Sequence, residues 1–133
     1  MQVEQMIEEL GKELELENPI PQEAEGVWVL YMDVDTPVTI SKLEDGFAFQ
    51  ATVCSLPEKS DEEAFLTKCL VGNLFGQGTA GAVLGLDARG EKLVLTREFH
   101  ELDYYVFSEG IEDFFNAIDF WRAETEEAAG QYK

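Results

Sequence analysis

The chain has 133 residues, of which 45% are hydrophobic and 11% aromatic, enough for the core of a single domain over residues 1–133. Its 28 acidic residues outnumber 9 basic ones and give a formal net charge of −19. Because nucleic acids and anionic membranes are also negative, this charge excludes simple electrostatic binding to them. We therefore expect a basic or apolar partner, and no direct nucleic-acid binding.

Two further features bear on the compartment. Cys54 and Cys69 lie in segments with strand and helix patterns and lack the spacing of a zinc site, so both are interpreted as buried thiols in a reducing environment. No apolar run approaches the roughly 18 residues of a membrane span, and the N-terminus is acidic where a signal peptide is basic. The sequence therefore predicts a cytoplasmic protein without membrane insertion.

The N-terminal half reads as a helix followed by three strands. Apolar residues from Val3 to Leu14 recur at helical spacing, and the helix is expected to end before Asn18-Pro19. Residues 27–32 are apolar on both faces of a strand. One face is therefore expected to contact the core, and the other a helix or a partner. Strands at 38–43 and 47–54 flank Glu44-Asp45-Gly46, whose Asp-Gly pair favours a tight hairpin.

The C-terminal half reads as helix, two strands, helix. After Ser60 comes a helix with an apolar surface wider than one sheet face requires, which suggests a second contact. Strands at 82–86 and 92–99 surround Arg89-Gly90, and a long helix with aromatic spacing is expected from about Ser108. The predicted fold is α+β, a mostly antiparallel twisted sheet of about five strands with three helices, in the order α-β-β-β-α-β-β-α.

The glycine-rich run from Gly76 to Gly81 resembles a nucleotide-binding loop but has the wrong context. A dinucleotide fingerprint follows a strand and opens a helix, whose N-terminal N–H groups face the phosphates. Here the glycines follow a helix, whose C-terminal carbonyls repel phosphate, and no basic residue lies between Lys68 and Arg89. We interpret the run as a helix end that permits close backbone packing.

Catalytic machinery is nearly absent from the sequence. His100 is the only histidine, and no nucleophile motif is linked to it. Asp33 and Asp35 place two carboxylates on one face of an extended segment, which is weak evidence in a chain with 28 acids. The sequence therefore predicts no enzyme, no catalytic residue, no metal and no cofactor. A small enzyme using these three side chains remains a lesser alternative.

Two local runs carry a resemblance to a known family. Leu70 to Gly81 resembles the second-helix exit, and Phe114 to Arg122 resembles the closing helix, of the class I type III secretion chaperones, the Tir-chaperone or CesT-like family. The size, the acidity and the order of elements agree with this family over roughly Val3 to Glu126. The resemblance implies a dimeric secretion-chaperone fold.

The resemblance also implies function and site residues. It implies a bacterial cytosolic chaperone that binds the N-terminal chaperone-binding segment of a secreted effector and keeps it secretion-competent. The implied effector-binding residues are Val3, Met6, Ile7, Leu10, Trp28 and Leu30. The implied dimer-interface residues are Leu66, Leu70, Leu74, Val83 and Leu84. The dimer can be a homodimer or a heterodimer with a related chaperone.

Alternatives remain open at this point. Val3, Ile7 and Leu10 can equally close the core of a monomer, since one helix face can serve both purposes. A second function is a regulatory protein that binds a subunit of the transcription apparatus, because some relatives couple secretion to gene expression, and an acidic surface could occupy a basic site on such a target.

Overall fold

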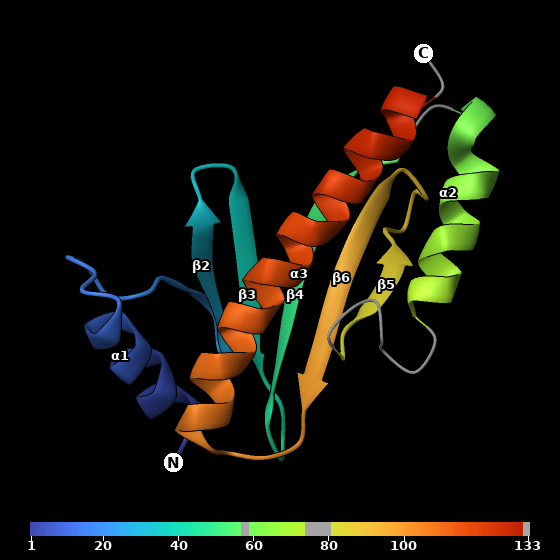
Figure 1. The fold of residues 1–133 in the computed structure, drawn as a ribbon. Coiled ribbons are helices and arrows are strands. Elements are labelled where there is room, and N and C mark those ends of the chain that lie inside the picture. The colour runs from blue at the N-terminus through green and yellow to red at the C-terminus, as the bar shows by residue number, and fades with distance from the viewer. Residues whose placement is uncertain (57–58, 74–80, 132–133) are drawn as a thin grey trace.

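The computed structural model describes residues 1–56, 59–73 and 81–131, which form one sheet covered by three helices (Figure 1). The elements in chain order are α1 (Val3–Glu13), β1 (Gln22–Ala24), β2 (Val27–Asp33), β3 (Thr36–Lys42), β4 (Phe47–Ser55), α2 (Lys59–Gly72), β5 (Val83–Leu86), β6 (Lys92–Phe99) and α3 (Tyr104–Gln131). The predicted α+β class and the three helices are confirmed. No helix within the described ranges combines the length and the apolarity that crossing a membrane would require.

The sheet has six strands in the order β1-β2-β3-β4-β6-β5, and every neighbouring pair is antiparallel. The predicted count of about five strands is therefore one too low. The additional strand is β1, a three-residue edge strand whose side chains are all exposed. A strand this short and polar has no alternating apolar pattern, which is why the sequence did not reveal it.

The segment around Asp33 and Asp35 is a tight turn, and its interpretation as an extended pair of carboxylates was wrong. Strand β2 ends at Asp33 and β3 starts at Thr36. The Asp33 side chain accepts a hydrogen bond from the backbone N–H of Asp35 at 3.0 Å, so this carboxylate stabilises the turn. Hydrogen bonds from the Thr36 hydroxyl and the Asp35 backbone N–H, and then the Arg122 guanidinium, hold the pKa of Asp33 below its ordinary value.

The turn between β3 and β4 forms where the Asp-Gly pair predicts it, but Gly46 is required for a different reason. The φ of Gly46 is not positive. A Cβ atom at this position would lie 1.8 Å from the carbonyl oxygen of Phe99, so only glycine lets the turn pass against the end of β6.

Helix α3 begins at Tyr104, four residues before the predicted start near Ser108. The Asp103 carboxylate accepts a hydrogen bond from the N–H of Val106 at 3.1 Å, and the Asp103 carbonyl accepts one from Phe107 at 3.0 Å. Asp103 is thus the N-cap residue, and an aspartate ahead of an apolar run is a recognised start signal for a helix. The sequence therefore contained the information that places this boundary.

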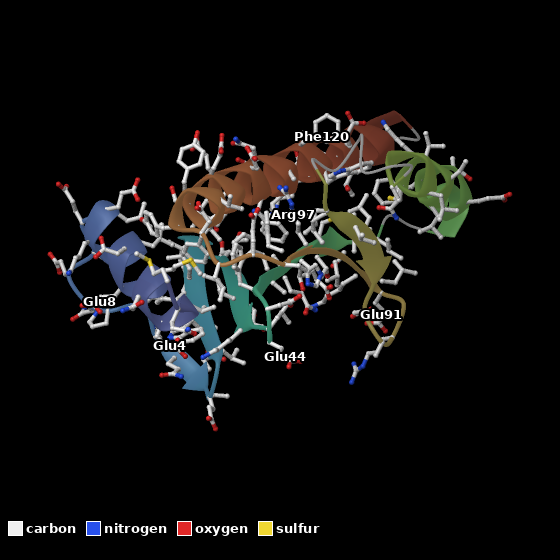
Figure 2. All side chains as sticks on the ribbon, turned by 90° about the horizontal axis from the view of Figure 1, so that it is seen from below. Glu4, Glu8, Glu44, Glu91, Arg97 and Phe120 are labelled. Carbon is white, nitrogen blue, oxygen red and sulfur yellow. The ribbon has the colours of Figure 1, made fainter. Side chains whose placement is uncertain are left out.

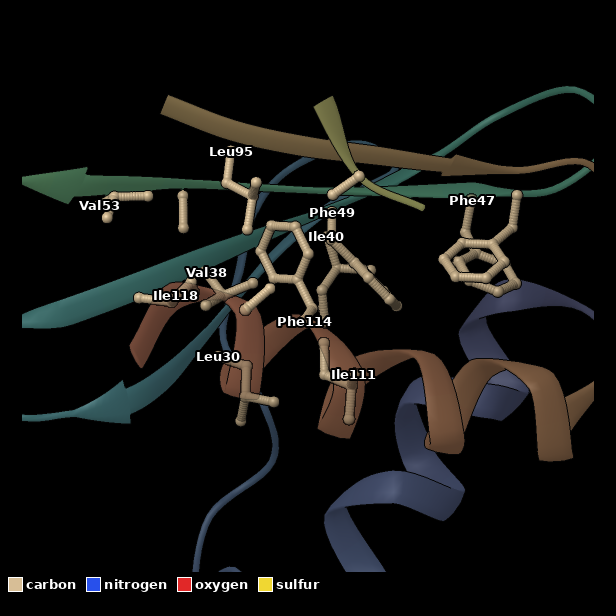
Figure 3. Close-up of a cluster of buried hydrophobic side chains, with 14 of the residues drawn as sticks. Leu30, Val38, Ile40, Phe47, Phe49, Val53, Leu95, Ile111, Phe114 and Ile118 are labelled. Atoms are coloured by element: carbon tan, nitrogen blue, oxygen red, sulfur yellow. The ribbon is translucent and has the colours of Figure 1, made fainter. Parts of the chain in front are cut away.

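The core lies between one face of the sheet and all three helices. Alternate strand residues point into it, and Ile111, Phe114 and Ile118 of α3 meet them from the helix side (Figure 3). The aromatic cluster includes Phe47 stacked on Phe99 with ring centroids 4.7 Å apart. The opposite face carries small or polar side chains at most positions, namely Thr39, Ser41, Ala48, Gln50, Thr52 and Thr96.

Trp121 and Arg122 of α3 connect this helix to α2 and to the sheet. Trp121 is buried against α2, where a Cβ atom on Gly72 would lie 2.5 Å from its ring. Arg122 donates hydrogen bonds to the carbonyl of Val53 at 2.8 Å and to the hydroxyl of buried Thr36 at 2.6 Å. These contacts hold α3 on the sheet around Trp121 and Arg122 and place α2 against α3.

Candidate partner-binding surfaces

A groove lies beside α1 at the β1 end of the sheet. It has a volume of about 650 Å³ and runs between α1, the connection from Leu16 to Pro21, and the start of β2. Its floor is apolar, formed by Ile7, Ile20 and Trp28, which are each no more than 7% exposed. A cavity of this size is within the range that proteins use to bind small ligands or side chains of a partner.

The turn at the end of α1 shapes this groove. The N–H of Leu16 donates to the carbonyl of Gly11 at 3.0 Å and that of Glu15 to Lys12 at 3.1 Å, the pattern of a Schellman cap. Glycine usually occupies the left-handed position of this cap, but here it is Glu15, with φ 54°. The cap reverses the chain, so that Leu16, 43% exposed, becomes part of the groove wall.

Acidic side chains form the rim of the groove. Glu4 and Glu8 project from α1 (Figure 2). Glu17, in the connection that follows α1, also lines the groove. The Lys42 ammonium donates to Glu4 at 2.8 Å, which ties α1 to β3 and lowers the pKa of the Glu4 carboxyl. Lys12 lies 3.7 Å from Glu8 and 3.9 Å from Glu9.

The six predicted effector-binding residues lie together, but inside the molecule. They come from α1 and β2 and are all buried in the single chain: Val3, Met6, Ile7, Leu10, Trp28 and Leu30. Only Ile7 and Trp28 among them line the groove. The sequence analysis missed Leu16 and Ile20, since the proline-rich connection that carries them has no periodic pattern. Contact of these residues with an effector stays a prediction.

A second pocket lies at the opposite edge of the sheet, between α2 and β5. It has a volume of about 250 Å³ and is lined by Leu66, Cys69, Leu70, Asn73, Leu84, Gly85, Leu86 and Leu93. None of these eight described lining residues is charged. Large apolar side chains stand exposed around it, with Leu70 71%, Val71 66% and Val83 60% accessible. We refer to this surface as the α2–β5 face.

Asn73 closes part of the outer edge of β5. Its side-chain oxygen accepts a hydrogen bond from the N–H of Leu84 at 2.7 Å, and its amide nitrogen donates to the carbonyl of Leu84 at 2.9 Å. The amide thus replaces the backbone of a neighbouring strand at this position. An edge strand covered in this way is a poorer template for a further strand.

The predicted dimer residues lie on or near the α2–β5 face. Leu66 and Leu70 from α2 line its pocket, as does buried Leu84 from β5, and Val83 is exposed beside it. Leu74 lies outside the described residues. Dimerisation through these residues stays a prediction.

The strand register excludes the alternative of a small enzyme that uses Asp33, Asp35 and His100 together. Val27 of β2 is level with Glu98 of β6 through the pairs Val27↔Ser41, Ser41↔Ala48 and Ala48↔Glu98. Asp33 lies six residues further along β2, roughly 20 Å away at about 3.3 Å per residue, and His100 lies beyond Glu98 in the opposite direction. Asp33, Asp35 and His100 therefore cannot act on one substrate.

Two further reactive side chains, His100 and Cys69, are also accounted for by the fold. The Nδ1 atom of His100 lies 3.1 Å from both oxygens of Asp45, which raises the pKa of the histidine. Burial raises the pKa of the Cys69 thiol to about 11, so it is protonated at neutral pH. Among residues 1–56, 59–73 and 81–131, no group of three or more His, Cys, Asp or Glu side chains could hold a metal ion.

Comparison with known protein families identifies the family to which this chain belongs. The model of the Tir chaperone protein (CesT) family matches residues 5–122 of this chain. The chain therefore belongs to the Tir chaperone protein (CesT) family, and the resemblance inferred from the sequence is confirmed. This is a family of secretion chaperones and not of enzymes.

Individual relatives are distant but cover nearly the whole chain. A protein of Chlamydia pneumoniae is 25% identical over 123 residues, which are 92% of this chain and 95% of the relative. A chain in the structure of the HopA1–SchA chaperone–effector complex superposes with a TM-score of 0.71 at 17% identity, over 90% of this chain and 92% of that one. A chain in the ExsC–ExsE complex gives the same TM-score and identity over 94% and 97%. These structures establish the fold.

Proposed function

We propose that the protein is a bacterial cytoplasmic type III secretion chaperone that binds the N-terminal chaperone-binding segment of a secreted effector and keeps it soluble until secretion. Membership of the CesT family supports this proposal, as does the fold shared with a chain of a chaperone–effector complex. The observation that carries it is the groove beside α1. About 650 Å³ with an apolar floor remains after the fold has closed its own core, as a binding protein requires.

The six buried residues of α1 and β2 support such a groove from beneath. Val3, Met6, Leu10 and Leu30 belong to the same buried cluster as Ile7 and Trp28, which line the groove. In the proposed complex, an extended effector segment lies along the groove, and exposed β1 beside it offers a free sheet edge for strand addition.

We further propose that two copies associate through the α2–β5 face. A chain with a net charge of −19 is repelled by its own copy, so a contact between copies has to avoid charge. The described residues that line the α2–β5 pocket carry no charge, and exposed Leu70, Val71 and Val83 surround it. A related chaperone with the same uncharged face would fit equally well.

The proposal is tested by capture of the tagged chain from the cytosol of its own host and identification of co-purifying proteins by mass spectrometry. We expect a secreted protein whose binding is lost when roughly its first hundred residues are removed. Deletion of the chaperone gene should abolish secretion of that protein while its transcript level is unchanged.

Two results would contradict the proposal. Capture of a transcription-apparatus subunit without any secreted protein would favour the regulatory alternative. Normal secretion of the captured protein after deletion of the chaperone gene would show that binding has no role in export.

A further inference from the structure

The α1 groove combines an apolar floor with a negative rim, and this combination indicates the chemistry of its ligand. Ile7, Ile20 and Trp28 offer apolar surface, and Leu16 adds a partly exposed wall. A side chain that enters the groove is therefore favoured if it is aliphatic or aromatic. Backbone and flanking side chains of the ligand would remain at the rim.

The rim has more carboxylates than ammonium groups. Four carboxylates stand on or next to it, from Glu4, Glu8, Glu9 and Glu17. Two lysines face them: Lys42 is bound to Glu4, and Lys12 is shared between Glu8 and Glu9. The local excess is two negative charges, which attract cationic side chains at the edge of an apolar site.

We infer that the groove recognises an extended peptide in which one or more large apolar residues are flanked by lysine or arginine. This inference rests on the proposed function, since the peptide would belong to the effector. The long methylene stems of lysine and arginine can lie against Leu16 while their charged ends reach Glu8 and Glu17.

The charge of the chain argues against the other occupants of this groove. A second copy would bring a further 19 negative charges and has an uncharged face available elsewhere. An acidic or phosphorylated segment would place like charges at the rim without a free cation to meet them, because Lys12 and Lys42 are already paired.

Fluorescence anisotropy with three labelled peptides of about 12 residues tests the inference. An extended segment alternates its side chains, so leucine at every second position can face the groove while the intervening positions face the rim. The intervening residues are lysine in the first peptide, serine in the second and glutamate in the third. We expect affinity to fall in that order, and the advantage of the lysine peptide to shrink with added salt.

Two double variants with the same change in charge test whether the preference for the lysine peptide comes from the groove rim. Glu8→Gln with Glu17→Gln should weaken binding of the lysine peptide by about two- to tenfold, the range of one or two exposed ion pairs. Glu109→Gln with Glu112→Gln removes two exposed carboxylates from α3, away from the groove, and should change the affinity less than about twofold. Leu16→Ser should weaken all three peptides alike, because it alters the apolar wall.

The inference is wrong if the glutamate peptide binds as tightly as the lysine peptide, or if the α3 double variant has the same effect as the groove double variant. Circular dichroism of each variant establishes that it is folded. The outcome is separable from that of the proposed function. A captured effector whose groove-bound segment has no basic residue would overturn this inference alone, whereas selective binding of the lysine peptide without any secreted client would overturn the proposed function alone.

Discussion

The α1 groove and the α2–β5 face stand at opposite edges of one sheet and differ mainly in charge. The groove is large and bordered by Glu4, Glu8 and Glu17, whereas the pocket of the α2–β5 face is smaller and, in the part of the chain that the structure describes, is lined by uncharged residues. In a chain that carries 28 acidic residues, a surface without charge is the exception. The contrast is the basis of our two proposals, a basic segment at the groove and a second acidic chaperone at the α2–β5 face.

The largest effect is expected from a charge placed on the α2–β5 face. Leu70→Glu should weaken self-association at least about a hundredfold, because the new carboxylate would be buried without a partner at the contact. Leu70 is 71% exposed in the single chain, so the monomer should remain folded. Sedimentation velocity over a concentration series measures the change. Leu16→Glu is the matched control at the groove, and a dimer weakened equally by both variants would refute the assignment.

The second effect concerns the edge of β5. Asn73→Ala removes both side-chain hydrogen bonds to Leu84 and should lower the free energy of unfolding by about 1–2 kcal/mol. The amide hydrogen of Leu84 should also exchange faster, and urea unfolding with hydrogen-exchange mass spectrometry measures both. Asn116→Ala, at an exposed position on α3, is the control. Unchanged exchange at Leu84 would show that Asn73 does not protect this edge.

A stabilising effect is expected at the turn that shapes the groove. Glu15→Gly should raise the free energy of unfolding by about 0.5–1 kcal/mol, because glycine adopts the left-handed conformation of the Schellman cap without strain. Glu13→Gly is the control in the last turn of α1, where the helical conformation makes glycine destabilising. A destabilised Glu15→Gly variant would mean that the Glu15 conformation contributes no strain.

The smallest effect is the pH dependence of the ion pair between Lys42 and Glu4. The pKa of Glu4 is held below its ordinary value of 4.5, so the pair stabilises the fold above that pH and ceases to do so as the pH falls through the lowered value. Lys42→Met should therefore shift the urea midpoint slightly at pH 7, and progressively less as the pH is lowered through the depressed pKa of Glu4. A shift that persists at the lower pH would reflect lost packing and not the ion pair.

Much of this fold could be predicted from the sequence because its patterns are local. Residues 92–99 alternate and form β6 with those bounds, and the Arg89-Gly90 turn closes with Gly90 at φ 68°. Two predictions failed. Strand β1 has no apolar pattern, and Asp33-Val34-Asp35 forms a turn where the sequence predicted an extended segment. In these places the hydrogen bonds of neighbouring segments decide the structure.

The candidate sites were less predictable, since exposure depends on which partner each apolar residue finds within the chain. Apolar spacing identified α1 but could not tell that Val3 and Met6 are fully buried while Leu16 lines a groove. On α2 the width of the apolar surface agrees with the exposure of Leu70, because an apolar surface wider than the sheet can cover has to leave some residues exposed. Whether Leu70 lies in a dimer interface stays a prediction.

The ionic-strength dependence of both associations in the same protein tests the central claim most directly. The affinity of the lysine peptide for the groove and the self-association constant are measured from about 50 to 500 mM salt, where screening becomes strong. The account predicts opposite signs: peptide binding weakens as its attraction to the rim is screened, and self-association strengthens as repulsion between the two acidic chains is screened. Changes of the same sign in both constants would contradict the division of the surface into an acidic groove and an uncharged face.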